Sequence, residues 1–451
     1  MLTRLRLLLH RCGIDRAVSY VLLERVWTLL SSAITIFFVA KFLVPEEQGF
    51  FTTFRNLLNL RIVFELGVAY VVVQMTSHEM AHIQLTDGLL SGDVKRIRRI
   101  SSLLHLTVKW YGFAALLFFI SLAPFGFWFY GQDPASSKVV WHAPWLLTTV
   151  STAGIILLSP LLAILEGMGL VAEVAFFRFF TVFVGGWLVW ILLVFHKGLY
   201  AVPALLLPEL AAALIYIFWH RRRLFSQLWH AKHPEDRIDW MKEAFPFQWR
   251  IAVSWIAGYM QTQLFGPILF HAKGSVEAGR LGLSMNAMAA ISAITIAWVQ
   301  TKAPKMGMLI AKREFSQLNR LFFPALIQAT FASFVVAGLL DGGVLWLYES
   351  HSAYATRVIE PGPFAILTLA TIVGSILLCQ ALYLRAHKEE PFMGISLVGA
   401  IAMAVMALVV APRFGANGIV VGYLVSMIVV CLVPATIVFE AKRKSWHSEA
   451  S

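Results

Sequence analysis

Charged residues are scarce in this chain: Asp, Glu, Lys and Arg make up 14% of its 451 residues, while hydrophobic residues make up 59%. A soluble globular domain carries about 25% charged residues, so the composition excludes an ordinary soluble protein. Cysteine is also scarce, with three residues in the whole chain, which argues against a disulfide framework. Glycine-rich nucleotide-binding signatures are absent, so we expect neither direct ATP hydrolysis nor a cofactor.

What the chain has instead is long apolar runs. Each is about 20 residues or longer, enough to cross a hydrocarbon core of about 30 Å. Because the core offers no water to the backbone, the spans must be helices, and the runs are too long for the strands of a β-barrel. We therefore predict an all-α polytopic membrane protein with about twelve transmembrane helices. The predicted spans are 18–42, 50–75, 103–127, 144–165, 172–195, 201–219, 249–271, 279–301, 321–347, 363–384, 392–411 and 418–440.

Lys and Arg are unevenly distributed between the loops. With a cytoplasmic N-terminus, 25 of the 37 fall on the cytoplasmic side, seven on the opposite side and five within spans. The positive-inside rule therefore predicts that both termini are cytoplasmic. The bias accounts for the net charge of +12 without a nucleic-acid partner. The basic residues 1–16 are expected to form a partly amphipathic helix on the lipids of the inner leaflet.

The longest polar stretch, residues 220–248, falls at the midpoint of the chain, with six predicted spans on either side. We therefore expect two six-helix lobes, residues 1–235 and residues 236–451. An offset of 230 residues aligns a few positions of the two halves, as in transporters built from internal repeats; coincidence is the alternative. The matching positions are Glu47 with Glu277, Gly49 with Gly279 and Asn56 with Asn286.

The first two predicted spans carry polar side chains at membrane depth. They are joined by a predicted turn, Pro45-Glu46-Glu47-Gln48-Gly49. An ionisable group within a bilayer is costly, so it normally faces a bundle interior or a wet cavity. This hairpin therefore indicates a path for a polar molecule. The polar residues are Glu24, Arg25, Arg55, Asn56, Asn59, Arg61 and Glu65.

Five segments resemble a known family. Residues 42–50, 64–67 and 77–81 resemble the first hairpin of bacterial polysaccharide flippases, and residues 249–255 and 278–282 resemble their seventh and eighth spans. These flippases form the O-antigen (lipopolysaccharide) and exopolysaccharide branch of the multidrug/oligosaccharidyl-lipid/polysaccharide exporter superfamily. The resemblance implies two lobes around a V-shaped central cavity, alternating access, and an undecaprenyl-diphosphate-linked oligosaccharide as substrate. It also implies a non-enzymatic protein of the bacterial inner membrane, and it allows a polymerase and a chain-length regulator as partners.

Arginine side chains within the spans are the candidates for binding a diphosphate, since guanidinium groups bind phosphate bidentately. Arg61 is the best placed, about 11 residues into the second span and so ~16 Å deep. Its alternative role is an ion pair with Glu65, one helical turn away. For Arg55 the alternative is snorkelling to the outer surface, and for Arg25 and Arg178 it is anchoring at the interface.

Other polar residues complete the predicted site. Glu24 and Glu65 are candidates for ion coupling, because a buried carboxyl can exchange a proton as the cavity opens; charge pairing with arginine is the alternative. Gln261 and Asn286 suit sugar hydroxyls but could form ordinary interhelical hydrogen bonds. The full set of predicted substrate-binding residues is Arg25, Arg55, Asn59, Arg61, Arg178, Arg250, Gln261 and Asn286.

A stripe of small polar residues repeats along one face of the tenth span. Thr368, Thr371, Ser375 and Cys379 follow helical spacing. The stripe could line a cavity or serve helix packing. No metal is expected in the protein.

Two rival functions belong to other classes. His78-Glu79-Met80-Ala81-His82 fits the zinc motif H-E-x-x-H, and Leu340-Asp341-Gly342 resembles the third-ligand motif of intramembrane metalloproteases. The predicted topology opposes a protease, because it puts these segments near opposite membrane faces. A cation-coupled drug or small-molecule exporter of the same fold would favour an acidic, aromatic cavity, whereas the first hairpin holds three Arg against two Glu.

Overall fold

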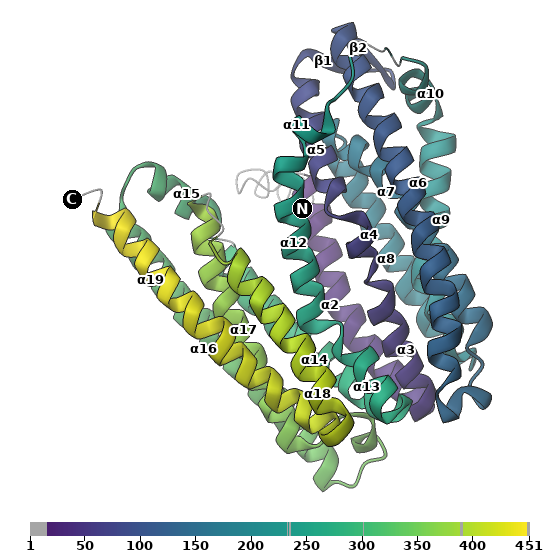
Figure 1. The fold of residues 1–451 in the computed structure, drawn as a ribbon, viewed down its shortest axis with the longest axis vertical. Helices are drawn as coiled ribbons and strands as arrows, with labels where there is room; N and C mark the ends of the chain where they lie inside the picture. Colours follow the sequence, from purple (N-terminus) through teal and green to yellow (C-terminus); the bar gives the residue numbers. More distant parts are fainter. Residues whose placement is uncertain (1–15, 232, 234–235, 301, 388–390, 449–451) are drawn as a thin grey trace, which may run out of the picture. The chain divides into compact units, whose positions relative to one another are not determined.

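The computed structural model describes residues 16–231, 233, 236–300, 302–387 and 391–448. Helices dominate the described residues (Figure 1). One antiparallel hairpin, β1 (Ile83–Thr86) with β2 (Leu89–Gly92), interrupts them. The all-α prediction is confirmed, and the predicted N-terminal amphipathic helix falls almost wholly outside the described residues.

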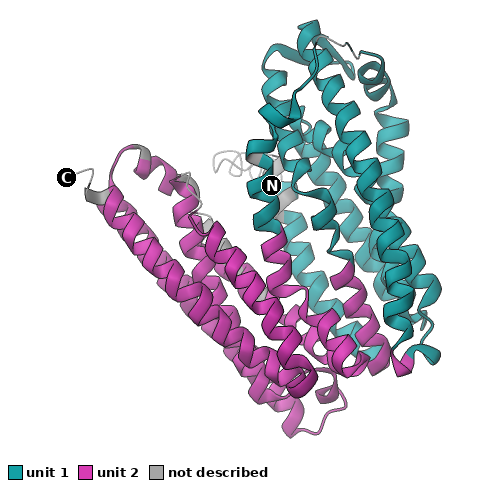
Figure 2. Cartoon of the chain, in the orientation of Figure 1, with its two compact units in different colours: residues 1–43, 58–132, 136–255 teal, residues 44–57, 133–135, 256–451 magenta. Residues whose placement is uncertain are grey.

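The chain divides into two compact units, coloured separately in Figure 2. Unit 1 comprises residues 1–43, 58–132 and 136–255, and unit 2 comprises residues 44–57, 133–135 and 256–451. The chain passes from one unit to the other between Leu43 and Val44, within α3 (Pro45–Leu58), on either side of residues 133–135, and within α12 (Phe245–Thr262). The predicted lobes, residues 1–235 and 236–451, stay a prediction.

The helices of unit 1 follow the predicted spans, with long apolar helices joined by short turns. Their bounds are α2 (Arg16–Phe42), α4 (Arg61–Glu65), α5 (Val68–Glu79), α6 (Val94–Gly131), α7 (His142–Gly167), α8 (Val171–Val194), α9 (Pro203–Ile215), α10 (Arg222–His230) and α11 (Trp240–Glu243). The turns are η1 (Met80–His82), η2 (Pro134–Ser137, which crosses between the units), η3 (Gly198–Ala201) and η4 (Tyr216–His220).

Unit 2 has the same character. Its elements are α13 (Phe265–Lys273), α14 (Ser275–Gln300), α15 (Ala303–Ala311), α16 (Phe315–Glu349), η5 (Ala355–Arg357), α17 (Pro361–Ala386), α18 (Met393–Ser426), η6 (Met427–Leu432) and α19 (Val433–Ser448). The last two predicted spans form one helical stretch of 54 residues with a non-helical residue, Gly415 (φ 59°, ψ −144°), inside it. Among the described residues, eight helices are long and apolar enough to cross a membrane, or nine if a bent pair counts as one span. Helices occupy the described residues of the predicted ranges, but the predicted span 249–271 is divided between α12, which ends at Thr262, and α13, which begins at Phe265.

The predicted turn at residues 45–49 is wrong, because these residues begin α3. Proline suits the first helical position, where no N–H needs a partner, and Glu46 and Glu47 lie in the first turn, where they favour the helix dipole. The Glu47 carboxylate also accepts a hydrogen bond from the Val44 N–H at 3.3 Å, which satisfies a backbone donor at the helix start. Only Leu43 and Val44 therefore separate α2 from α3.

The predicted second span, 50–75, is not one straight helix. It breaks after α3 and again between α4 and α5, where Leu66 (φ 48°) and Gly67 (φ 68°) both adopt the left-handed conformation. The segments on either side of this second break are bent by 46°. Glycine reaches a positive φ at no steric cost, so Gly67 explains why the chain turns here.

Within unit 2, α3 packs closely on α14 at positions that the repeat offset relates. A Cβ on Gly279 would lie 2.8 Å from the Gly49 nitrogen, and a Cβ on Gly282 would lie 2.7 Å from Thr52 Cβ. Gln48 Nε2 also donates to the Gly279 carbonyl at 2.9 Å. Contact between equivalent positions is what a local two-fold axis produces, so this packing agrees with the internal repeat.

Candidate functional site

A pocket of 430 Å³ lies within unit 1 among four intramembrane helices and the broken second span. Its volume is within the 300–1,000 Å³ typical of small-molecule sites. Charged, polar and apolar residues all contribute to its lining. The lining residues are Arg61, Glu65, Ala69, Tyr70, Val73, Ile155, Leu158, Ser159, Leu162, Ala163, Glu166, Arg178, Glu209, Ala213 and Trp255.

The broken second span positions two of these charges. Arg61 begins α4 and Glu65 ends it, so the single helical turn carries both on one face. Both side chains are half-buried. Their charges interact, but within the described residues no direct ion pair joins them. The guanidinium of Arg61 therefore keeps its hydrogen-bonding edge available within the pocket.

Arg178, on α8, is already engaged in this structure. Its guanidinium forms an ion pair with Glu166, the penultimate residue of α7, at 2.7 Å. Glu24, on α2, interacts electrostatically with Arg178 and with Arg25. This contact uses one of the five N–H donors of the guanidinium, so the predicted anchoring role of Arg178 and its predicted phosphate role both stay open.

Glu209 is a site residue that the sequence reasoning missed. It lies on α9, lines the pocket and interacts electrostatically with Arg61 and Arg178. The available signal was a carboxyl inside the predicted span 201–219, next to Pro208. With Glu209 and Glu166 included, the pocket lining holds three carboxylates and two guanidiniums. The charge of the pocket is therefore mixed rather than simply cationic.

Three other predicted site residues lie elsewhere in unit 1. Arg25 is exposed on α2, and Asn59 is exposed between α3 and α4. Arg250 is exposed on α12, with its guanidinium 5.7 Å from the centre of the Trp249 ring. None of the three lines the 430 Å³ pocket.

The remaining predicted site residues lie in unit 2. The Arg55 guanidinium lies 6.0 Å from the centre of the Phe51 ring. Gln261 donates from Nε2 to the Ser396 carbonyl at 3.0 Å, which is the interhelical hydrogen bond named as its alternative role. Asn286 is half-buried on α14. The binding roles of these three residues stay predictions.

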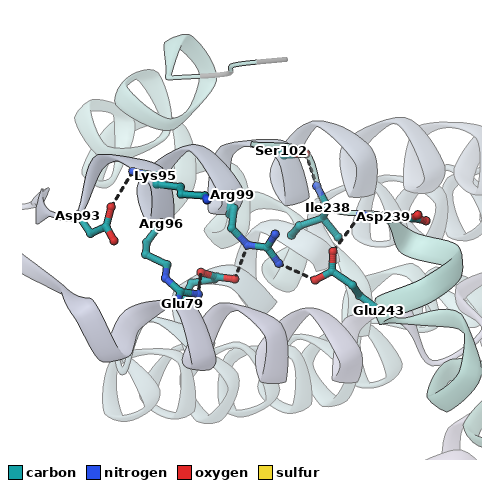
Figure 3. A network of polar contacts seen from close by, with 9 residues as sticks. All are labelled: Glu79, Asp93, Lys95, Arg96, Arg99, Ser102, Ile238, Asp239 and Glu243. Carbon is teal, nitrogen blue, oxygen red and sulfur yellow. Dashed lines mark hydrogen bonds and ion pairs between the residues drawn. The ribbon is translucent and has the colours of Figure 1, made fainter. Parts of the chain in front are cut away.

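Glu79, the central residue of the H-E-x-x-H motif, belongs to an ion-pair network in unit 1 (Figure 3). Glu79 is buried, with 5% of its surface exposed. Its carboxylate binds Arg96 at 2.8 Å and Arg99 at 2.7 Å. Arg99 in turn binds Glu243 of α11 at 2.5 Å. Within the described part of the chain, no three His, Cys, Asp or Glu side chains gather in a way that could hold a metal ion. In this structure the Glu79 carboxylate of the motif therefore binds two arginine side chains.

The polar stripe on α17 is buried within unit 2. Thr368, Thr371, Ser375 and Cys379 are all buried. Thr371 donates to the Leu367 carbonyl of its own helix at 2.8 Å. The stripe packs against neighbouring helices, as its second interpretation expected.

The fold is similar to that of several solved transporters. An inward-facing multidrug resistance MATE family transporter of the MOP superfamily matches with a TM-score of 0.67 at 12% identity, over 97% of this chain and 100% of that one. The lipid II flippase MurJ, in an inward closed conformation, matches with a TM-score of 0.63 at 14% identity, over 95% of this chain and 90% of that one. The chain has the MOP-superfamily fold.

A third match is the MATE multidrug transporter DinF-BH, solved in complex with R6G, with a TM-score of 0.57 at 13% identity over 95% of each chain. No family model matches the sequence, and no curated protein matches it. The MOP-superfamily fold makes the chain a multi-pass membrane protein of twelve helices in two lobes. At such low identity the matches establish the fold and leave the substrate open.

Proposed function

We propose that the protein is a flippase that moves a polyprenyl-diphosphate-linked oligosaccharide across a bacterial inner membrane by alternating access. It would supply cell-surface or extracellular polysaccharide synthesis, with both termini in the cytoplasm and without catalysing a reaction. The observation that carries the proposal is the unit 1 pocket, which brings Arg61 and Arg178 together between membrane-spanning helices. The likeness in fold to the lipid II flippase MurJ supports the same substrate class.

The pocket suits a diphosphate joined to a sugar. Arg61 makes no direct ion pair within the described residues, so its guanidinium can bind a phosphate oxygen. Tyr70 and Trp255 bring aromatic rings to the same pocket. An aromatic ring offers a sugar an apolar face and a polar edge at once. The lining therefore contains partners for both parts of the substrate head group.

The glutamates give the pocket a means of coupling to protons. With all carboxylates ionised, three negative charges face two positive ones. Protonation of Glu65 would remove one negative charge next to Arg61 and favour an anionic substrate. Glu24 would act in the same way on Arg178, with which it interacts. In this proposal the two predicted ion-coupling residues set the anion affinity of the pocket.

A second candidate function is favoured by the same carboxylates. A cation-coupled exporter of drugs or other small cations would use Glu65, Glu166 and Glu209 as counter-charges, with Tyr70 and Trp255 as aromatic walls. The matches to MATE multidrug transporters support this alternative. The two candidates differ in which charge of the pocket binds the substrate.

The two functions separate when the purified protein is reconstituted into liposomes. One assay follows flipping of a fluorescent polyprenyl-diphosphate sugar, and the other follows uptake of a fluorescent organic cation. We expect flipping by the natural chain and at least about a tenfold loss in Arg61→Ala, because a hydrogen bond to a charged group contributes about 1.5–3 kcal/mol. Arg413→Ala, an exposed arginine on α18, is the matched control and should flip normally.

The outcomes are distinct. Normal flipping in Arg61→Ala removes Arg61 from the site. Cation uptake that is lost in Glu209→Gln, together with no flipping by the natural chain, establishes the exporter instead. Insertion of each variant into the membrane is checked first, so that a folding defect is not counted as a loss of transport.

A further inference from the structure

Glu209 is a carboxyl group at the centre of a membrane-spanning segment of unit 1. The helical segment that contains it runs from Gly198 to His220. Glu209 lies midway between these ends, about 16 Å from each at 1.5 Å per residue. Ala213, one turn later on α9, also lines the 430 Å³ pocket, whereas Leu207 and Leu214, on the opposite face, are exposed. The face of α9 that carries Glu209 is thus turned to the pocket and away from the lipid.

The other charges of the pocket lining balance one another. Arg178 forms a direct ion pair with Glu166 at 2.7 Å. Arg61 and Glu65 lie one turn apart on α4, and their charges interact. These two pairs account for both guanidiniums of the lining and for two of its three carboxylates. Glu209 is therefore the carboxylate for which the lining has no further counter-charge.

Glu209 shares its cationic neighbours with other carboxylates. It interacts electrostatically with both guanidiniums of the lining, but also with Glu65, whose negative charge repels it. Among the residues that the structure describes, no direct ion pair or hydrogen bond reaches its carboxylate. Counting Glu24 and its neighbour Arg25, which lie on α2 next to this cluster, adds one charge of each sign and leaves the excess unchanged. A carboxylate at this depth is unfavourable unless a cation or a proton reaches it.

The pocket suits an organic ammonium group better than a metal ion. Within the described residues, no three His, Cys, Asp or Glu side chains gather in a way that could hold a metal ion. Tyr70 and Trp255, however, line the same pocket as Glu209. Aromatic faces attract ammonium groups, and an ammonium N–H forms a charge-assisted hydrogen bond with a carboxylate. A carboxylate and aromatic rings in one pocket are together the groups that recognise an amine.

Arg61 gives the same pocket a group of the opposite charge. Its guanidinium makes no direct ion pair within the described part of the chain, and neither does the carboxylate of Glu209. A ligand that carries both an anionic and a cationic group therefore matches both side chains. A purely anionic ligand would add its negative charges to a lining that already has one carboxylate in excess.

We propose that the sugar next to the diphosphate of the substrate carries a free amino group, which binds Glu209 while the diphosphate binds Arg61. This inference rests on the proposed flippase function and narrows its substrate to lipid-linked amino sugars that are not N-acylated. Glu209 is then a specificity-determining residue. N-acetylation would remove the positive charge and leave the carboxylate without its partner, and a site built around such a hydrogen bond rejects the analogue that lacks it.

The flipping of two matched substrates tests this inference. Purified protein in liposomes is given polyprenyl-diphosphate glucosamine or its N-acetylated form, both with a fluorescent label on the lipid tail. We expect the natural chain to flip the free amine at least about tenfold faster, the ratio that one hydrogen bond to a charged group supplies. Glu209→Gln should flip the two forms at similar rates, because its amide has no charge for the amine to match. Glu349→Gln, which removes an exposed carboxyl on α16, is the matched control and should keep the preference.

The outcomes separate this inference from the flippase proposal. Arg61→Ala should slow both forms and keep the ratio of their rates, because both carry the diphosphate. Equal flipping of the two forms by the natural chain overturns the inference and leaves the flippase proposal standing. A preference that survives in Glu209→Gln overturns the role of Glu209. If neither form is flipped, the flippase proposal fails and this inference fails with it.

Insertion of each variant into the membrane is checked before transport is measured. If Glu209→Gln does not insert, Glu209→Asp keeps the charge on a shorter side chain and should keep the preference for the amine. A loss of the preference in Glu209→Ala with normal insertion supports the assignment in the same way. The ratio of the two rates in the natural chain decides the substrate class without any variant.

Discussion

Replacing Gly67 by alanine should destabilise unit 1 through two separate effects. Gly67 has φ 68°, a left-handed conformation that costs an L-residue such as alanine about 1–2 kcal/mol. The new methyl group would also lie 2.7 Å from Ile251 Cγ2 and 3.4 Å from Ile251 Cβ. Overpacking of this kind costs about 1–3 kcal/mol. We therefore expect Gly67→Ala to lower the free energy of unfolding by roughly 2–5 kcal/mol.

Ile251→Leu should rescue part of this loss. Leucine has no methyl branch at Cβ, so it removes the atom closest to the new alanine while keeping the volume of the side chain. The swap alone should cost less than about 1.5 kcal/mol. In the double variant we expect the clash to disappear and the backbone strain to remain, which gives a favourable coupling energy of about 1 kcal/mol or more in a double-mutant cycle.

Unfolding by titration with denaturing detergent measures all four members of the cycle. Gly169→Ala is the matched control, because Gly169 also has a positive φ of 89° but a Cβ there meets no atom within 4 Å. It should show the backbone cost alone. If Gly67→Ala loses no more stability than Gly169→Ala, or if Ile251→Leu brings no relief, the close contact between the break in the second span and α12 is refuted.

Two further substitutions have definite outcomes. Glu79→Gln should destabilise unit 1 by about 1.5–3 kcal/mol, because the amide gives up one of the two charged acceptors that bind Arg96 and Arg99. A loss of activity at unchanged stability would instead support the zinc-protease interpretation. Asp87→Asn, on the exposed hairpin tip, is the control. Gly126→Ala should cost about 1–3 kcal/mol, because its methyl group would overlap the fully buried Trp145 indole. Gly131→Ala, at the last residue of the same helix, should be neutral when measured by the same detergent titration, because a Cβ there would meet no atom within 4 Å.

Local patterns were enough to predict the helices and the pairing of Arg61 with Glu65 on one face. Both depend on residues within a few positions of one another, where hydrophobic runs and helical spacing apply. The break at Leu66 and Gly67 had a local signal in its glycine, yet the run of apolar residues on both sides favoured one continuous span. The apolar run also concealed the start of α3, which the Pro45-Glu46-Glu47 sequence marks as the first turn of a helix.

The composition of the pocket could not be predicted in this way. Glu166 and Glu209 come from α7 and α9, and only tertiary packing brings them to Arg61 and Arg178. The charge count of the first hairpin therefore gave a cationic site, whereas the folded pocket has more carboxylates than guanidiniums. Glu79 shows the converse case. Its local motif suggested the catalytic glutamate of a zinc site, but Arg96 and Arg99 lie on another helix and bind its carboxylate directly.

The carboxyl groups inside the two units differ in their partners, and this difference separates their chemistry. In unit 1 Glu65, Glu166 and Glu209 each have an arginine as an electrostatic or direct partner. Each of these carboxylates lies close to a guanidinium, so protonation of Glu65 would leave Arg61 more available to an anionic substrate. In unit 2 the partner of Asp341 is a hydroxyl group, because Thr368 Oγ1 donates to its carboxylate at 3.1 Å. If the flippase proposal holds, anion binding in unit 1 should weaken as the ionic strength rises, because salt screens the attraction between the guanidiniums and the anion.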